Sequence, residues 1–85
     1  MVLSDAEYEL RKFLKATDNF EVIHLVLSGS VISGKLSSYD PEETTVQLDE
    51  ATIYSGLQSV TVETIFIPIR KILAWGYGDI SKNGP

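Results

Sequence analysis

The sequence predicts a mainly β protein: a small, strongly bent five-stranded antiparallel barrel with an N-terminal α-helix. Two observations lead to this prediction. Residues 4–17 carry apolar side chains at helical spacing, whereas residues 20–77 form short runs of β-branched and aromatic residues separated by turn residues. With 85 residues the chain has room for one small domain, which we expect to span 1–80, with 81–85 as a short tail.

The N-terminal segment has the start signal and the spacing of an amphipathic helix. Ser4 is a good N-cap, and Glu7 three residues later completes a capping box. Glu7 and Arg11 stand four residues apart, where opposite charges favour a helix. The apolar face is expected to consist of Ala6, Leu10, Phe13 and Leu14.

The first two strands are expected over residues 20–27 and 31–39, joined by a turn at Ser28-Gly29. The first strand is apolar on both faces, which predicts a covering on each side: the barrel interior on one face and the N-terminal helix on part of the other. Gly34 lies inside the second strand, where glycine is unfavourable unless the chain bends sharply or another backbone approaches closely. A small barrel requires such a bend.

Three more strands complete the expected barrel. The third begins at Thr44 and its pattern can continue to Tyr54; the fourth covers residues 60–67 and ends at Pro68; the fifth covers residues 69–77. The last two strands carry more large apolar side chains than one small barrel can bury. Because exposed edge strands pair with a neighbour unless they are protected, we expect strands four and five to join copies of the chain head to tail in a closed ring.

Composition narrows the possible functions. The chain has no cysteine, which excludes disulfides and thiolate metal sites and is compatible with a reducing cytoplasm, where we expect the protein. No apolar run reaches the roughly 20 residues that span a bilayer and the N-terminus lacks the regions of a signal peptide, so we expect no membrane partner. The formal net charge of −5 argues against a nonspecific nucleic-acid coat, which depends on many Lys and Arg residues.

The most specific pattern lies between Leu27 and Asp40. It consists of a turn glycine, an apolar residue, a bend glycine, a leucine, an aromatic residue and an aspartate: Gly29, Ile32, Gly34, Leu36, Tyr39 and Asp40. This pattern resembles the first signature motif of the Sm/LSm proteins, the RNA-binding rings that include bacterial Hfq. The resemblance covers about residues 4–77 and implies an SH3-like, Sm-like barrel. In the weaker second motif, Arg70 stands at the family's basic or His position, and Lys71 stands where many members have glycine.

The resemblance implies a ring-shaped homo-oligomer that binds single-stranded RNA, or DNA, at its pore and acts in RNA processing or metabolism. Arg70 and Lys71 would line the pore and contact phosphate or stack on bases. Asp40 would organise the loop after the second strand, at the rim of the pore. The implied RNA-binding residues are Arg70, Lys71, Asp40, Thr44, Thr45 and Tyr39.

Several of these residues have a simpler interpretation. An adjacent basic pair is often a solvated turn, although ring symmetry would gather many copies of it at one pore. Tyr39 can be a packing residue rather than a base-stacking platform, and Asp40 can accept hydrogen bonds from the loop backbone rather than contact a ligand. His24, the only histidine, is expected to be partly buried and hydrogen-bonded rather than a metal ligand.

The sequence departs from the Sm pattern in the loop after Tyr39. That loop is one residue longer than usual, it has no Asn at the base-reading position, and it carries Glu42 and Glu43, which repel phosphate. A second interpretation therefore stays open: an assembly or adaptor barrel that binds only proteins. No catalytic grouping is present, so we expect a non-enzymatic protein with no cofactor and no metal site.

Overall fold

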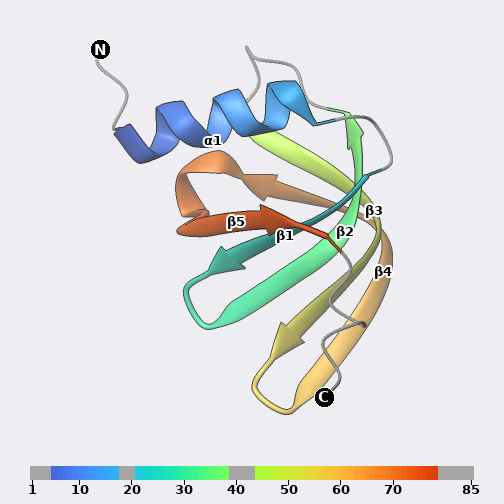
Figure 1. The fold of residues 1–85 in the computed structure, drawn as a ribbon. Helices are drawn as coiled ribbons and strands as arrows, with labels where there is room; N and C mark the ends of the chain where they lie inside the picture. The colour runs from blue at the N-terminus through green and yellow to red at the C-terminus, as the bar shows by residue number, and fades with distance from the viewer. Residues whose placement is uncertain (1–4, 18–20, 39–43, 79–85) are drawn as a thin grey trace.

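The computed structural model describes residues 5–17, 21–38 and 44–78 (Figure 1). Within them the elements are α1 (Asp5–Ala16), β1 (Val22–Leu27), β2 (Ser30–Ser38), β3 (Thr45–Ser55), β4 (Gln58–Pro68), the short 3-10 helix η1 (Ile69–Lys71) and β5 (Ala74–Tyr77). The strands form one antiparallel sheet in the order β4-β3-β2-β1-β5. The sheet bends strongly and α1 crosses one end of it (Figure 1). The predicted class, a bent five-stranded antiparallel sheet with an N-terminal helix, is confirmed.

Helix α1 packs on the sheet through its middle and C-terminal turns. Leu10 and Leu14, one turn apart, are almost completely buried, and the Arg11 guanidinium lies 3.1 Å from the Glu7 carboxylate on a more exposed face, as expected. Ala6 was predicted to share the buried face but is exposed, because the buried part of the helix begins only at Leu10. Ser4, the predicted N-cap, lies outside the described residues.

The prediction that β1 is covered on both faces is wrong. Ile23 and Leu25 are fully buried on one face, and Leu10 and Leu14 of the helix belong to the same buried cluster. The helix therefore covers the inner face of the sheet, the face that the barrel also closes. On the opposite, outer face of β1, Val22 is exposed and His24 and Val26 are partly buried, so the described residues do not cover this face fully.

Gly34 occupies the bend that the sequence predicted, and the structure gives the reason. The register of β2 against β3 shifts by one residue here, so Glu50 and Ala51 together stand opposite Gly34. Glu50 has a φ of 50°, and a Cβ placed on Gly34 would lie 2.9 Å from the Cβ of Ala51. The strands thus form a β-bulge whose close contact permits no side chain at position 34.

The fifth strand is much shorter than predicted. Of residues 69–77, the first three form η1 and only Ala74–Tyr77 form β5. Pro68, with a φ of −63°, ends β4 at one edge of the sheet, and the chain must then cross to β1 near the other edge. Three hydrogen bonds among the described residues hold this crossing. The Ile69 N–H donates to the Thr44 carbonyl at 2.9 Å, the Ile72 N–H donates to the Ile69 carbonyl at 3.1 Å, and the Leu73 N–H donates to the Val26 carbonyl at 2.7 Å.

Strands β4 and β5 are the two edges of the sheet. Part of the apolar surplus predicted for this region enters the core, as Ile67, Ile69 and Ile72 do. The remainder includes three large side chains that are exposed by 62%, 65% and 70%: Phe66, Leu73 and Tyr77. The edges therefore present apolar side chains beside unpaired backbone, although Tyr77 also stacks on Phe13 of α1 at a ring-centroid distance of 6.1 Å.

Candidate functional site

The predicted basic pair lies on the short helix that links the two edge strands. Arg70 and Lys71 are both exposed on η1. Pro68 constrains the backbone before this helix, and the Ile69–Thr44 hydrogen bond ties its start to the beginning of β3. The basic pair therefore projects from a backbone that is held at a fixed position on the rim of the sheet.

Both cations are available to an external anion. The ion pairs among the described residues are Arg11–Glu7 and Lys35–Glu50, so neither Arg70 nor Lys71 has an acidic partner in the part of the chain that the structure covers. An exposed Arg can bind phosphate in a bidentate manner or stack on a planar base, whereas Lys acts as a point charge. The pair thus offers both modes of contact to a polyanion.

The structure brings four of the six predicted site residues to one rim. Thr44 accepts the hydrogen bond from Ile69, and Thr45 pairs with Pro68 in the β3–β4 ladder. Arg70 and Lys71 follow directly in the chain. Tyr39 and Asp40, the other two predicted residues, lie outside the described residues, so their roles remain predictions.

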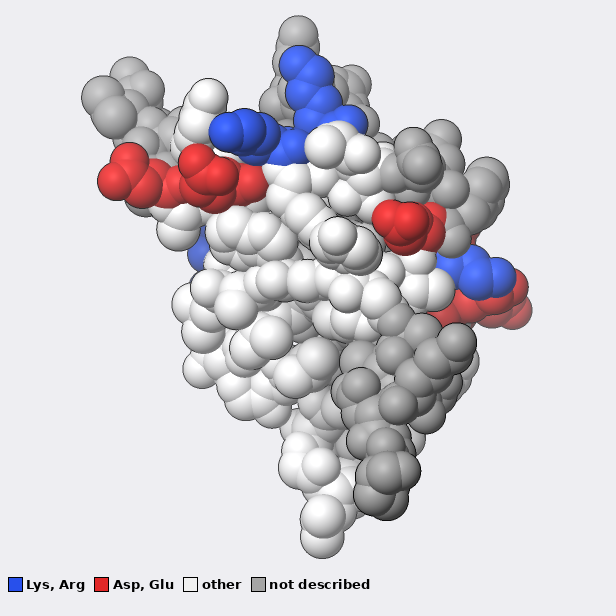
Figure 2. Space-filling model, viewed as in Figure 1, with Lys and Arg blue, Asp and Glu red and all other residues white. Residues whose placement is uncertain are grey.

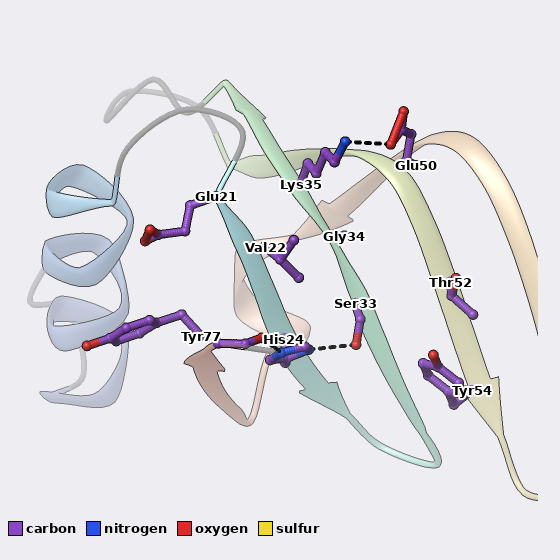
Figure 3. Close-up of a pocket in the computed structure, with 11 residues that line it drawn as sticks. Glu21, Val22, His24, Ser33, Gly34, Lys35, Glu50, Thr52, Tyr54 and Tyr77 are labelled. Carbon is purple, nitrogen blue, oxygen red and sulfur yellow. Dashed lines mark hydrogen bonds and ion pairs between the residues drawn. The ribbon is translucent and has the colours of Figure 1, made fainter. Parts of the chain in front are cut away.

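A second feature, which the sequence did not predict, is a groove on the outer face of the sheet (Figure 3). It has two adjoining parts of about 500 and about 480 Å³ that share His24, Ser33 and Tyr54. The first part contains the Lys35–Glu50 ion pair at 2.7 Å. The second part lies over β5, β1, β2 and β3 and is predominantly apolar. No local pattern indicated the groove, because the apolar outer residues of β1 predict a second covering on this face.

His24 is held at the centre of the groove by its neighbours. Its Nε2 lies 2.6 Å from the Gly78 carbonyl oxygen, and its Nδ1 lies 2.7 Å from the Ser33 hydroxyl. A carbonyl oxygen only accepts hydrogen bonds, so Nε2 carries a proton and donates it. In the neutral ring Nδ1 then accepts from Ser33. The expectation of a partly buried, hydrogen-bonded histidine is confirmed.

The described residues hold neither a cluster of metal-binding side chains nor a membrane-spanning helix. Within residues 5–17, 21–38 and 44–78, no three His, Cys, Asp or Glu side chains are grouped closely enough to hold a metal ion. The same part of the chain contains no helix that is long and apolar enough to cross a membrane.

Comparison with known proteins identifies the fold. No protein-family model matches the sequence, and no curated protein matches it. Among solved structures, a heptameric archaeal Sm protein superimposes with a TM-score of 0.66 at 16% identity, over 80% of this chain and 98% of that one. The Sm protein of Pyrococcus abyssii in complex with a uridine heptamer gives a TM-score of 0.63 at 19% identity, over 84% and 96% of the two chains.

A third similar structure comes from a different kind of assembly. One chain of the NatC complex bound to CoA superimposes with a TM-score of 0.64 at 14% identity, over 92% of this chain and 88% of that one. At such identities the similarity establishes the fold. This chain has the Sm fold, as the pattern between Leu27 and Asp40 predicted.

Proposed function

We propose that this protein assembles into a ring of identical copies and binds single-stranded RNA at the pore through Arg70 and Lys71. The observation that carries the proposal is the position of this exposed basic pair. The Ile69–Thr44 hydrogen bond fixes it on the rim of an Sm fold, next to the start of β3. In this proposal Thr44, Thr45, Tyr39 and Asp40 shape the rim around the pair. The Pyrococcus abyssii Sm protein, which has a similar fold and whose structure is in complex with a uridine heptamer, supports an RNA ligand.

Ring assembly is supported by the two free edges of the sheet. Among the described strands, β4 with eleven residues and β5 with four residues are the two edges of the sheet, each with a neighbouring strand on one side only. Natural proteins protect exposed edges with Lys, Pro or bulges, but β4 contains one charged residue, Glu63, and its proline stands at the end. Because the two edges lie on opposite sides of one chain, head-to-tail pairing can close into a ring.

The net charge of −5 does not prevent RNA binding at a pore. A ring gathers one Arg70–Lys71 pair from every copy around one axis, and clustered charge of one sign focuses the local potential. The described acidic residues of the helix and strands lie on α1, β3 and β4, namely Asp5, Glu7, Glu9, Asp49, Glu50 and Glu63. We therefore expect weak binding away from the pore and a single dominant site for short RNA.

Two measurements test the proposal: light scattering for the ring and fluorescence anisotropy with labelled oligouridine for RNA binding. We expect a closed oligomer, and at least a tenfold loss of RNA affinity in the double variant Arg70→Ala/Lys71→Ala, given about 1.5–3 kcal/mol for a hydrogen bond to a charged group. Lys15→Ala, an exposed cation at the end of α1, is the matched control and should change affinity by less than about threefold. A monomer in solution excludes the ring, and unchanged affinity in the double variant excludes the pore assignment.

A second candidate function is that of an assembly or adaptor module that contacts proteins only. Two observations support it. One chain of the NatC complex has a similar fold, and the similarity covers 88% of that chain; the net charge of this protein is negative. Oligouridine and oligothymidine, each titrated at low salt, separate the candidates and also distinguish RNA from DNA. If neither oligonucleotide binds, the result favours the adaptor function. For both candidates we propose a non-enzymatic role in the cytoplasm.

A further inference from the structure

Nothing in the described part of one copy of the chain requires glycine at position 76, in the middle of β5. Among the five glycines in the described ranges, three have a positive φ: Gly29, Gly56 and Gly78. At Gly34 a Cβ would collide with Ala51. A Cβ on Gly76 would meet nothing within 4 Å, and its φ lies outside the left-handed region. Glycine weakens a strand interior and often marks a bulge, a tight bend or a close approach by a ligand or another backbone. The β1–β5 register runs through Gly76 without a shift, so no bulge accounts for the residue, and a close approach from outside this copy is the explanation that we pursue.

The space above Gly76 belongs to the apolar part of the outer-face groove. In the β1–β5 ladder, Gly76 pairs with His24 and Ala74 pairs with Val26, so these four residues share the outer face. The two outward-facing residues of β5 are therefore glycine and alanine, the two smallest residue types. Their small size leaves open space above the edge of the sheet, and we call Gly76 and Ala74 the floor of the groove at this edge. Figure 2 shows no described charged side chain over β5, since those on this face lie around α1 and along one flank.

The opposite edge of the same chain carries a side chain that suits this floor. Phe66 lies near the end of β4 between Ile65, which is partly buried, and Ile67, which is 2% exposed. Because side chains alternate along a strand, Phe66 points to the outer face, where it is 62% exposed. An aromatic ring left in water at a free edge is unfavourable and gains from an apolar partner.

We propose that Phe66 of one copy packs over Gly76 and Ala74 of the next copy and closes the groove at the β5 edge. This inference rests on the ring assembly in the proposed function and names the contact that stabilises it. Pairing β5 with a neighbour's β4 continues one sheet, so outer side chains of both strands stay on one face. Adjacent strands lie about 4.8 Å apart, and aromatic side chains reach across to direct and diagonal neighbours. An aromatic side chain that covers a glycine on the adjacent strand stabilises such pairs.

A second copy is the occupant that the structure favours. The small floor and the exposed aromatic ring lie at the two opposite edges of one sheet, so each copy has both halves of the contact and can make it in either direction around a ring. The edges are also matched in charge, since β5 has no charged residue and β4 has Glu63 alone.

The test is the concentration at which the oligomer dissociates, measured by sedimentation velocity over a dilution series. We expect Phe66→Ala and Gly76→Val each to raise that concentration at least about tenfold, as for a central aromatic contact in an interface. Gly76→Ala, a smaller change, should act in the same direction. The control is Tyr8→Ala, which removes an aromatic side chain that is 57% exposed on α1. It should change the dissociation concentration by less than about threefold. Circular dichroism should show the wild-type fold for every variant, since position 76 has free space and Phe66 is mostly exposed.

Two further results separate this inference from the function on which it rests. If the contact exists, the double variant Phe66→Ala/Gly76→Val should dissociate at nearly the same concentration as either single variant, because both changes remove the same contact. A ring whose dissociation is unchanged in both single variants overturns the Phe66 contact and leaves the RNA-binding ring intact. A wild-type chain that is monomeric at every concentration overturns both. A ring that responds to these variants but binds no oligouridine supports the contact and excludes the RNA function.

Discussion

Gly34 and Ala51 lie so close across the β2–β3 ladder that a Cβ atom on Gly34 would stand 2.9 Å from the Cβ of Ala51. Real Cβ atoms essentially never approach a neighbour at this distance, and main-chain atoms of β3 are also close, with the Ala51 Cα 3.0 Å and the Asp49 carbonyl oxygen 3.2 Å away. The close approach occurs where Glu50 adds one residue to β3. The β-bulge at Gly34 thus depends on the absence of a side chain at this position.

Gly34→Ala should therefore destabilise the fold by about 1–3 kcal/mol, the usual cost of overpacking a close contact. Urea denaturation followed by circular dichroism measures the change in unfolding free energy. Gly76→Ala is the matched control, because the new methyl group there meets nothing within 4 Å, and it should stay within about 0.5 kcal/mol of the wild type at concentrations where the chain is monomeric. Equal stability of Gly34→Ala and wild type would contradict the β-bulge geometry.

Glu50 is the described residue other than glycine with a positive φ, 50°. A β-branched side chain is strained in this conformation, so Glu50→Val should lower the unfolding free energy by about 1–2 kcal/mol. Glu50→Gly should be close to neutral, because the relief of backbone strain offsets the loss of the ion pair with Lys35. That pair is solvent-accessible at both side chains and is worth at most about 1 kcal/mol. Glu63→Val, on the exposed strand β4, is the control. If Glu50→Val is no less stable than Glu63→Val, the left-handed conformation is not a constraint.

The hydrogen bonds of His24 fix where the neutral ring carries its proton. Because the Gly78 carbonyl can only accept, the proton belongs on Nε2, which lies 2.6 Å from that oxygen. Long-range ¹H–¹⁵N NMR of the imidazole should show the Nε2–H tautomer. Ser33→Ala removes the donor to Nδ1 and should cost about 0.5–1.5 kcal/mol while leaving the tautomer unchanged. Observation of the Nδ1–H tautomer would show that the Gly78 hydrogen bond is absent.

Salt dependence tests how Arg70 and Lys71 act on RNA. For single strands the slope of log affinity against log salt concentration is about −0.7 per neutralised phosphate. If the pair binds phosphates, the slope in Arg70→Ala/Lys71→Ala should be less steep by about 0.7 for each phosphate that is no longer neutralised. Stacking on bases would lower the affinity with little change of slope. Titrations of oligouridine between 50 and 300 mM salt, roughly the range that such slopes require, distinguish the two modes, and a steeper slope would contradict both.

Local patterns in the sequence were sufficient for most of the elements. Helical spacing located α1, and the glycine inside an apolar alternating segment located the bend at Gly34. Pro68 marked the end of β4 at the correct residue. The fifth strand was predicted too long because apolar residues of η1, such as Ile69, enter the core through a turn, and composition alone does not distinguish a buried turn from a strand.

The mainly β class, the N-terminal helix and the bend at Gly34 could be predicted from the residues alone, since turn glycines, β-propensity and apolar spacing act through local geometry. The Sm fold was predicted from the resemblance of residues 27–40 to a known motif. Which faces are covered depends instead on tertiary packing. Alternation shows that β1 has two apolar faces, but it does not show that α1 packs on the inner one and leaves the groove at His24 open. Packing also brings Thr44 to Ile69 and places Phe66 and Gly76 at opposite edges of the sheet. These relationships join residues far apart in the chain, and they exist only when the order of strands in the sheet is known.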